Sequence, residues 1–173
     1  MPPAAQQAAF SGIAHTPITR VYFRVTRPFW EDDGLPNSMW TDTPLERIFA
    51  VRDETSGEVV ALSSHADGPG AQQLDAMDED ERLRFALDTL VALRPAAKGA
   101  VEAVTSTSWA QDPFAGGAYP FYAPGQVGRL RPAAALPHGR IHFAGEHTAI
   151  SSPGMEGACE SADRAVAELL ARI

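Results

Sequence analysis

The stretch RIHFAGEHTAISSPGMEGACESADRAV, residues 140–166, combines a carboxylate, a glycine-rich bend and the expected start of a helix. Glu146 precedes the bend, and Gly154 and Gly157 let a ligand come close to the backbone. The first turn of a helix has unpaired N–H groups and a positive dipole end, which favour an anion or a developing negative charge. The phosphate-loop pattern G-x-x-x-x-G-K is absent, and an ordinary strand, bend and helix remains the alternative.

The other reactive side chains form no catalytic or metal-binding pattern. The five histidines lack the H-E-x-x-H spacing of a zinc site, and no order of serine, histidine and aspartate indicates a triad. Cys159 falls beside the apolar stripe of the last expected helix, where a packing role is commoner than a nucleophilic one. The sequence therefore predicts no metal site.

The alternation of ITRVYFRVT at residues 18–26 predicts a strand with two unlike faces. Val21 and Phe23 belong to one face, which we expect to lie on a core. Arg20 and Tyr22 belong to the opposite face, so Arg20 faces either a cavity or solvent.

Three more strands are expected downstream. RIFAVR (47–52) and EVVALSS (58–64) flank DETSG, which predicts a hairpin with a glycine-containing loop. AVEAVTST (100–107) also has the composition of a strand.

Residues 78–94 have the clearest helical pattern in the middle of the chain. Asp78 is the expected N-cap, Glu81 follows three residues later, and Pro95 ends the helix. An apolar stripe is formed by Leu83, Ala86, Leu87, Leu90 and Val91.

The C-terminal third begins with residues 112–139, which are rich in glycine, proline and aromatic residues and predict a long irregular connection. RIHFA (140–144) predicts a strand, and the last helix is expected to begin near Pro153, with Ser152 at its cap. The expected buried face of this helix comprises Met155, Ala158, Ala162, Ala165, Val166 and Leu169.

Composition limits the possible partners. The chain has 173 residues, a net charge of -8 and a pI of about 5.0, so a polyanion such as nucleic acid is an unfavourable partner. No apolar run is long enough to span a bilayer, and the start MPPAAQQAAFSG lacks the features of a secretory signal. A single cysteine fits a reducing compartment, and a cytoplasmic location is expected.

The 140–166 stretch closely resembles the C-terminal flavin-binding signature of the flavin-containing amine oxidase family, which includes monoamine, polyamine and L-amino-acid oxidases. That signature is an apolar strand, F-A-G-E/T-x-T, a short bend and M/I-E-G-A-x-x-S-G-x-R-A. The matching positions here are Phe143, Ala144, Gly145, Glu146, Thr148, Met155, Glu156, Gly157, Ala158, Ser161 and Arg164. Asp163 lies beside the position where the family often has glycine.

Two upstream segments are similar to the same family in order and spacing. WAQDPFAGGAYPFYAPGQ (109–126) resembles the segment that passes the flavin ring, and ITRVYFRVTRPFW (18–30) resembles the strand that enters the substrate domain. The resemblance implies an α+β fold. Residues 1–137 would be part of a mixed-sheet substrate-binding domain, and residues 138–173 the C-terminal strand and helix of a Rossmann-like FAD-binding domain.

The resemblance also implies which residues hold FAD. Glu146 would contact the ribityl–pyrophosphate region, and the backbone around Pro153, Gly154, Met155 and Glu156 would approach the pyrimidine edge of the flavin. Reduced flavin carries negative charge near that edge, so a helix N-terminus there favours reduction. A solvated loop acid is the alternative role of Glu146.

Trp109, Ala118 and Tyr119 match positions close to the flavin ring. Trp109 corresponds to a family tryptophan near the flavin, with core packing as the alternative. Ala118 stands where some monoamine oxidases have the cysteine that bonds the flavin, which implies non-covalent FAD. In some family members two aromatic rings flank the substrate amine. Tyr119 matches one of these rings, with packing of a loop aromatic as the alternative. The second ring would fall at Gly154, which has no side chain.

Arg20 stands where many members have a lysine that holds a water near the reactive flavin nitrogen. Arginine stays charged and does not act as a base, so in a pocket it would pair with a carboxylate or order a water. Arg20 and Tyr119 are therefore the candidate catalytic residues. The loop that begins RPFWEDDG favours an amino-acid or aromatic-amine substrate.

The G-x-G-x-x-G motif that seats the ADP part of FAD is missing from the chain. Three alternatives follow: one subunit of a split oxidase, a fragment that binds FAD poorly, or a non-catalytic binding or assembly module. The first implies hydride transfer from an amine C–H to flavin, which gives an imine. We expect an N-terminal FAD-binding chain or self-association to cover the exposed apolar faces.

Overall fold

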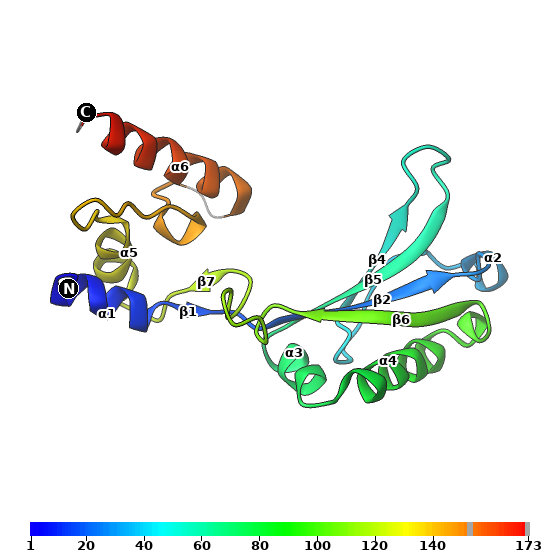
Figure 1. Ribbon diagram of the computed structural model, residues 1–173. Coiled ribbons are helices and arrows are strands. Elements are labelled where there is room, and N and C mark those ends of the chain that lie inside the picture. The colour runs from blue at the N-terminus through cyan, green and yellow to red at the C-terminus, as the bar shows by residue number, and fades with distance from the viewer. Residues whose placement is uncertain (152–153, 172–173) are drawn as a thin grey trace. The chain divides into compact units, whose positions relative to one another are not determined.

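The computed structural model describes residues 1–151 and 154–171 (Figure 1). Contacts divide the chain into two compact units. One unit combines Met1–Thr16 with Tyr119–Ile173, and the other is Pro17–Ala118. The predicted domain boundary between residues 137 and 138 differs from this division and remains a prediction about the complete fold.

The unit Pro17–Ala118 is built on a five-stranded sheet in the order β3-β4-β5-β2-β6. Its strands are β2 (Ile18–Val25), β3 (Met39–Trp40), β4 (Arg47–Arg52), β5 (Val59–Asp67) and β6 (Val101–Ser108). The predicted strands are confirmed, and β4 and β5 form the expected hairpin. All strand pairs are antiparallel in the described part of the chain, so the predicted mixed sheet is not found there.

The two faces of β2 differ as the alternation predicts. Val21 and Phe23 are fully buried, whereas Arg20 and Tyr22 on the other face are half-buried. The core of this unit joins Val21 and Phe23 to residues of α3 (Gly68–Asp75) and α4 (Glu79–Leu93). Figure 1 shows these two helices on one side of the sheet. The sheet therefore keeps a second face that carries polar and charged side chains.

Helix α4 begins at a complete capping box. The Asp78 carboxylate accepts a hydrogen bond from the Glu81 N–H at 2.8 Å, and the Glu81 carboxylate accepts one from the Asp78 N–H at 3.4 Å. Ala86 and Leu90 of the predicted stripe are buried, and its other members pack against the core. The predicted start, end and buried face of this helix are confirmed.

A buried arginine connects the end of α4 to the short helix α2 (Trp30–Asp33). Arg94 donates two hydrogen bonds to the Asp33 carboxylate, each at 2.6 Å, and one to the Pro36 carbonyl at 2.9 Å. The guanidinium carbon also lies 5.1 Å from the centre of the Phe29 ring. The Arg94 hydrogen bonds lower the pKa of Asp33. One side chain thus fixes the loop after β2 against the helix layer, next to the 3-10 turn η1 (Pro95–Ala97).

The other unit is mainly helical. Helix α1 (Ala4–Gly12) packs on α5 (Val127–Ala135), and the strands β1 (Ala14–His15) and β7 (Pro120–Phe121) pair antiparallel. The chain then forms a 3-10 turn, η2 (Glu146–Thr148), and helix α6 (Gly154–Leu170). No helix among the described residues has the length and apolar character needed to cross a membrane.

The prediction that residues 112–139 are wholly irregular is wrong, because α5 lies within them. Pro132 sits inside this helix and removes one backbone donor, which argues against a helix on local grounds. The helix forms because Leu130, Ala133 and Ala134 pack against Ala9 and Ile13. Tertiary packing here outweighs local propensity.

The predicted strand at residues 140–144 is also absent. In the described chain, only a single bridge between His138 and Ile141 involves this segment. A strand needs a hydrogen-bonding neighbour, and no described strand lies beside this one. The apolar pattern RIHFA therefore forms no strand among the described residues.

The buried face predicted for α6 is largely wrong. Gly157, Ser161 and Ala165 are its buried residues, whereas Met155, Val166 and Leu169 are exposed. The apolar stripe exists in the sequence, but no described residue covers it. Ser152 and Pro153, the predicted cap and first turn, lie outside the described residues.

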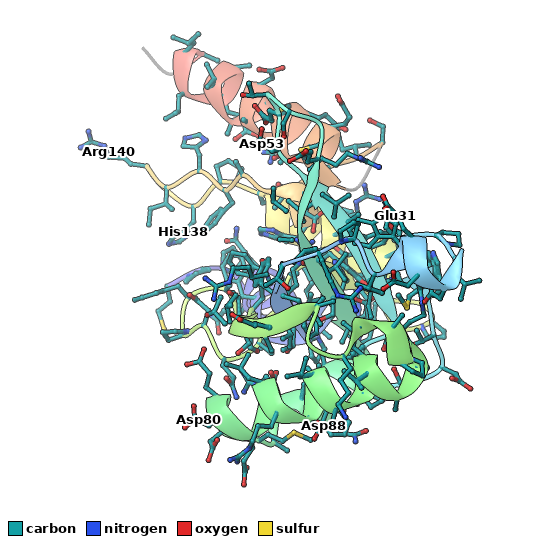
Figure 2. The ribbon with its side chains drawn as sticks, turned by 90° about the vertical axis from the view of Figure 1, so that its right-hand side faces the viewer. Glu31, Asp53, Asp80, Asp88, His138 and Arg140 are labelled. Carbon is teal, nitrogen blue, oxygen red and sulfur yellow. The ribbon has the colours of Figure 1, made fainter. Side chains whose placement is uncertain are left out.

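The capping box gives a direct test. Replacing Asp78 by Ala removes the acceptor for the Glu81 N–H, and we expect the free energy of unfolding to fall by about 1 kcal/mol. Urea unfolding would measure this difference. Asp88→Asn is the matched control, since Asp88 is exposed on the outer side of α4 (Figure 2). An Asp78→Ala loss no larger than that of the control would contradict the role of the cap.

Candidate functional site

The bend before α6 is organised by the Glu146 carboxylate. Glu146 opens the turn η2, and its Oε2 accepts a hydrogen bond from the Gly154 N–H at 2.5 Å. A carboxylate at the first N–H of a helix satisfies one unpaired donor and interacts favourably with the helix dipole. In this structure Glu146 therefore orients the start of α6.

Arg164 ties the bend to the preceding chain. Its guanidinium donates to the carbonyls of Phe143 at 2.8 Å and Ala135 at 3.2 Å, and to the Thr148 hydroxyl at 3.2 Å. It also forms an ion pair with Glu168 at 2.8 Å. The five donors of arginine suit such a junction, which lysine does not reproduce.

Gly145 begins the turn in a conformation that only glycine adopts readily. Its φ is +134°, and a Cβ built at this position would lie 2.6 Å from the His147 ring. The Gly145 N–H donates to the Ser161 hydroxyl at 2.8 Å. The chain thus passes close beside α6 at this point.

A second carboxylate, Glu160, fixes the far side of the bend. It accepts hydrogen bonds from the N–H groups of Ile150 at 2.8 Å and Ser151 at 3.1 Å, and from the Ser151 hydroxyl at 2.5 Å. These bonds, with the Ser151 hydroxyl as the largest cause, lower the pKa of Glu160 to about 2. Glu160 is consequently ionised at neutral pH.

The geometry around Gly154 can accommodate a flat ring system. A Cβ at Gly154 would have no neighbour within 4 Å, and its φ of +78° suits glycine. Met155 is 87% exposed, and Glu156 is also exposed. Glu146 engages the Gly154 N–H of this first turn. The residues present therefore fit a flavin edge; Pro153 lies outside the described residues.

Arg20 belongs to the other unit and lies in a charged row across three strands. Its Nη2 is 2.9 Å from His65 Nδ1, and His65 Nε2 is 3.2 Å from an oxygen of Asp67. Asp67 also forms an ion pair with Arg47. Arg20 is thus held within the protein on the polar face of the sheet and is not a free surface arginine.

Trp109 lies at the same end of this sheet as Arg20. It directly follows β6, is exposed, and donates its backbone N–H to the Ile18 carbonyl at 2.9 Å. The register pairs Arg20 with Thr107, two residues before Trp109. The structure thus brings two of the predicted residues to one edge of one unit.

Tyr119 belongs to the unit of α6, together with Glu146, Gly154, Met155 and Glu156. Its carbonyl accepts a hydrogen bond from the Thr16 N–H at 2.9 Å, and its side chain is partly exposed. The predicted residues are therefore distributed over both units.

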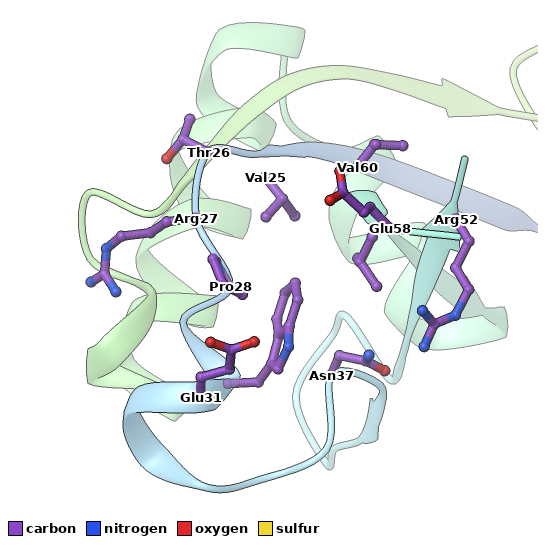
Figure 3. A pocket seen from close by; sticks show the side chains of 11 residues that line it. Val25, Thr26, Arg27, Pro28, Glu31, Asn37, Arg52, Glu58 and Val60 are labelled. Atoms are coloured by element: carbon purple, nitrogen blue, oxygen red, sulfur yellow. The ribbon is translucent and has the colours of Figure 1, made fainter. Parts of the chain in front are cut away.

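A cavity at one end of the sheet unit is lined by none of the predicted residues (Figure 3). It has a volume of about 500 Å³ and lies at the end of β2 opposite to Arg20. The Trp30 ring and Val25 line it, with Arg27, Glu31 and Arg52 around them. Arg27 is already paired with Asp32, and Arg52 with the Gly57 carbonyl. This cavity is therefore separate from the candidate site.

Sequence inspection missed His65, Glu160 and the bonding role of Arg164. His65 would have been found from the alternation of residues 59–67, which puts it on the same face of β5 as Ala61 and Ser63. Glu160 gives no such signal, because an acid on a helix commonly faces solvent. No group of three or more potential metal ligands occurs among residues 1–151 and 154–171.

Comparison with known proteins identifies related chains. A family model described as "Flavin containing amine oxidoreductase" matches residues 1–170. The chain is 28% identical to an L-amino-acid oxidase of Siganus canaliculatus over 93% of its own length and 32% of that protein. It is 31% identical to the flavin-dependent L-tryptophan oxidase RebO of Lentzea aerocolonigenes, over 86% of its own length and 33% of that protein.

Solved structures share the fold. Cyclohexylamine oxidase from Brevibacterium oxydans IH-35A superposes with a TM-score of 0.79 at 23% identity, over 98% of this chain and 38% of that one. A structure of putrescine oxidase bound to putrescine gives 0.74 at 20% identity, again over 98% of this chain and 38% of that one. The chain spans about a third of the length of the curated relatives it matches.

The role of Glu160 predicts a local change in protection. In Glu160→Gln the carboxylate charge is lost, and we expect the Ile150 and Ser151 amides to exchange with deuterium several-fold faster. The same amides should lose protection in the original protein only at strongly acidic pH. The folded pKa lies below the usual 4.5, so the stabilisation is complete above about pH 4.5 and is lost as the pH falls towards 2.

Asp163→Asn is the matched control for this experiment, because Asp163 is an exposed acid on the same helix. Unchanged exchange at residues 150 and 151 in Glu160→Gln would show that Glu160 does not hold the bend.

Proposed function

The chain belongs to the flavin containing amine oxidoreductase family, and we propose that it forms the C-terminal part of an FAD-dependent oxidase of amines or L-amino acids. The match of the family model over residues 1–170 carries this proposal. The related L-amino-acid and L-tryptophan oxidases support an amino acid as the substrate class.

The first turn of α6 would hold the flavin. When bound there, the flavin would supply the hydride-accepting chemistry that oxidises an amine to an imine. Gly154 leaves its side of the turn open, and the remaining N–H groups of that turn face developing negative charge favourably. Glu146 and Glu160 keep the bend in place from its two sides. With Ala118 in place of a cysteine, non-covalent FAD is the expected form.

Arg20 and Tyr119 would act on the substrate side. Arg20 is permanently charged, so it orders a water or pairs with a substrate carboxylate and takes no proton. Tyr119 offers one aromatic wall beside the substrate. Gly154 supplies no second ring, which leaves room for a larger substrate.

We further propose that this chain works with a polypeptide that supplies the dinucleotide-binding part. Within the described chain, the N–H and C=O groups of His142 and Ala144 have no backbone partner. Alternate residues of a strand direct their N–H and C=O groups to the same edge, so a partner strand that made this segment extended would pair with both residues at this open edge. The exposed apolar residues of α6 lie in the same unit. Both features suit a partner that contributes a strand.

Flavin binding tests the function. The chain would be expressed alone and together with the N-terminal two-thirds of a related L-amino-acid oxidase, followed by purification and a visible absorption spectrum. We expect a yellow complex with non-covalently bound FAD that oxidises an L-amino acid. A complex that assembles but takes up no FAD would overturn the oxidase proposal and favour a non-catalytic assembly module.

The open edge has its own test. Ile141 is 57% exposed, so Ile141→Lys should leave the free chain folded while it reduces co-purification of the N-terminal part at least tenfold. Leu35→Lys is the matched control, because Leu35 is 53% exposed and lies in the other unit. Equal co-purification of both variants would show that the edge is not the docking surface.

A further inference from the structure

Arg20, His65 and Arg47 lie side by side across β2, β5 and β4. The register pairs Thr19 with Ala66 and Tyr22 with Ser63, which puts Arg20 opposite His65. It also pairs Arg47 directly with His65. All three side chains belong to the sheet face opposite to the core residues Val21 and Phe23. The sheet itself therefore determines which side chains surround Arg20.

The hydrogen bonds fix the form of the His65 ring. Arg20 has only donors, so the His65 Nδ1 atom, 2.9 Å from Arg20 Nη2, must act as the acceptor and carry no proton. The proton of the neutral ring then lies on Nε2, which is 3.2 Å from Asp67 Oδ1. His65 thus connects a permanent cation to a carboxylate as a neutral imidazole of one tautomer.

The surrounding charges favour this neutral form. Arg20 faces His65 from β2, and Arg47 faces it from β4. Asp67 lies two residues further along β5. The Glu46 carboxylate, between β3 and β4, accepts a hydrogen bond from the Asp67 N–H at 3.1 Å. Burial, and then the charges of Arg47 and Arg20, lower the pKa of His65 against the opposing effect of Asp67. The ring is consequently neutral at neutral pH.

We infer that His65, oriented by Asp67, is a positioning residue that holds the Arg20 guanidinium in one orientation for substrate oxidation. This inference rests on the proposed function. The Arg20 Nε atom is buried and has no hydrogen-bond partner among the described residues. A guanidinium anchored at Nη2 by His65 cannot turn freely, so the directions of its other N–H groups are fixed.

A fall in pH breaks the hydrogen bond between Arg20 and His65. Protonation puts a hydrogen on Nδ1, so the ring can no longer accept from Arg20, and it adds a positive charge between two arginines. The pKa of His65 in the folded protein lies below that of an ordinary histidine. The stabilisation by the neutral His65 ring is therefore complete at a pH above the ordinary histidine pKa. It is lost as the pH falls through the folded value.

The first test uses the free chain and needs no cofactor. NMR of the protein labelled with ¹⁵N-histidine reports which ring nitrogen of His65 carries the proton, and a titration reports the pKa. We expect the Nε2–H tautomer and a pKa below that of a histidine model peptide. An Nδ1–H tautomer, or a ring that is charged at neutral pH, would overturn the inference, whether or not the oxidase activity is found.

The second test uses a matched pair of variants in the assembled oxidase. His65→Asn keeps an acceptor near the Nδ1 position, whereas His65→Gln keeps a polar group near Nε2 and loses the acceptor for Arg20. We expect His65→Gln to lower kcat/KM about tenfold, the effect of losing one hydrogen bond to a charged group. We expect kcat/KM of the original protein to fall at acidic pH, whereas His65→Asn should keep most of kcat/KM and lose this fall.

Circular dichroism of both variants shows whether the sheet is intact. Equal losses in two folded variants, or an acidic fall that persists in His65→Asn, would assign His65 a purely structural role. If the assembly shows no oxidase activity, the proposed function fails, while the NMR result still decides the orientation of Arg20.

Discussion

Backbone hydrogen bonding is the requirement on which the rest of this structure depends. Residues 140–144 have the composition of a strand, yet the described chain gives His142 and Ala144 no neighbour on their shared edge. The same unit exposes Met155, Val166 and Leu169, although their spacing is that of a buried helix face. Two independent patterns in the sequence are thus suited to contacts that the described residues do not make.

Three charged side chains hold the bend before α6 by hydrogen bonds to its backbone. Glu146 and Glu160 hold the two sides of the turn, and Arg164 joins it to the preceding segment. All three act on backbone groups and leave the space beside Gly154 open. The rigidity of the turn therefore does not depend on a ligand, which is the arrangement expected of a preorganised site.

The sequence predicted well the features that depend on local periodicity. The alternation of β2, the hairpin of β4 and β5, and the capping box of α4 all have local causes. Helix α5 was missed, because Pro132 argues against it and only its packing on α1 stabilises it. The alternation of residues 59–67 places His65 on one face of β5, but its contact with Arg20 depends on the register of the sheet. Glu146 and Gly154 were identified through a motif, while the hydrogen bond between them needed coordinates.

Gly145 affects how aligned relatives should be interpreted. Its φ of +134° strains any larger residue, and a Cβ would also displace the adjacent His147 ring. An invariant glycine in the F-A-G motif would therefore record a steric requirement of the turn and not selection for cofactor contact. A relative that had lost the ability to bind flavin but kept this turn would still carry the glycine. The presence of the motif consequently identifies ancestry and backbone shape more securely than it identifies present-day redox activity.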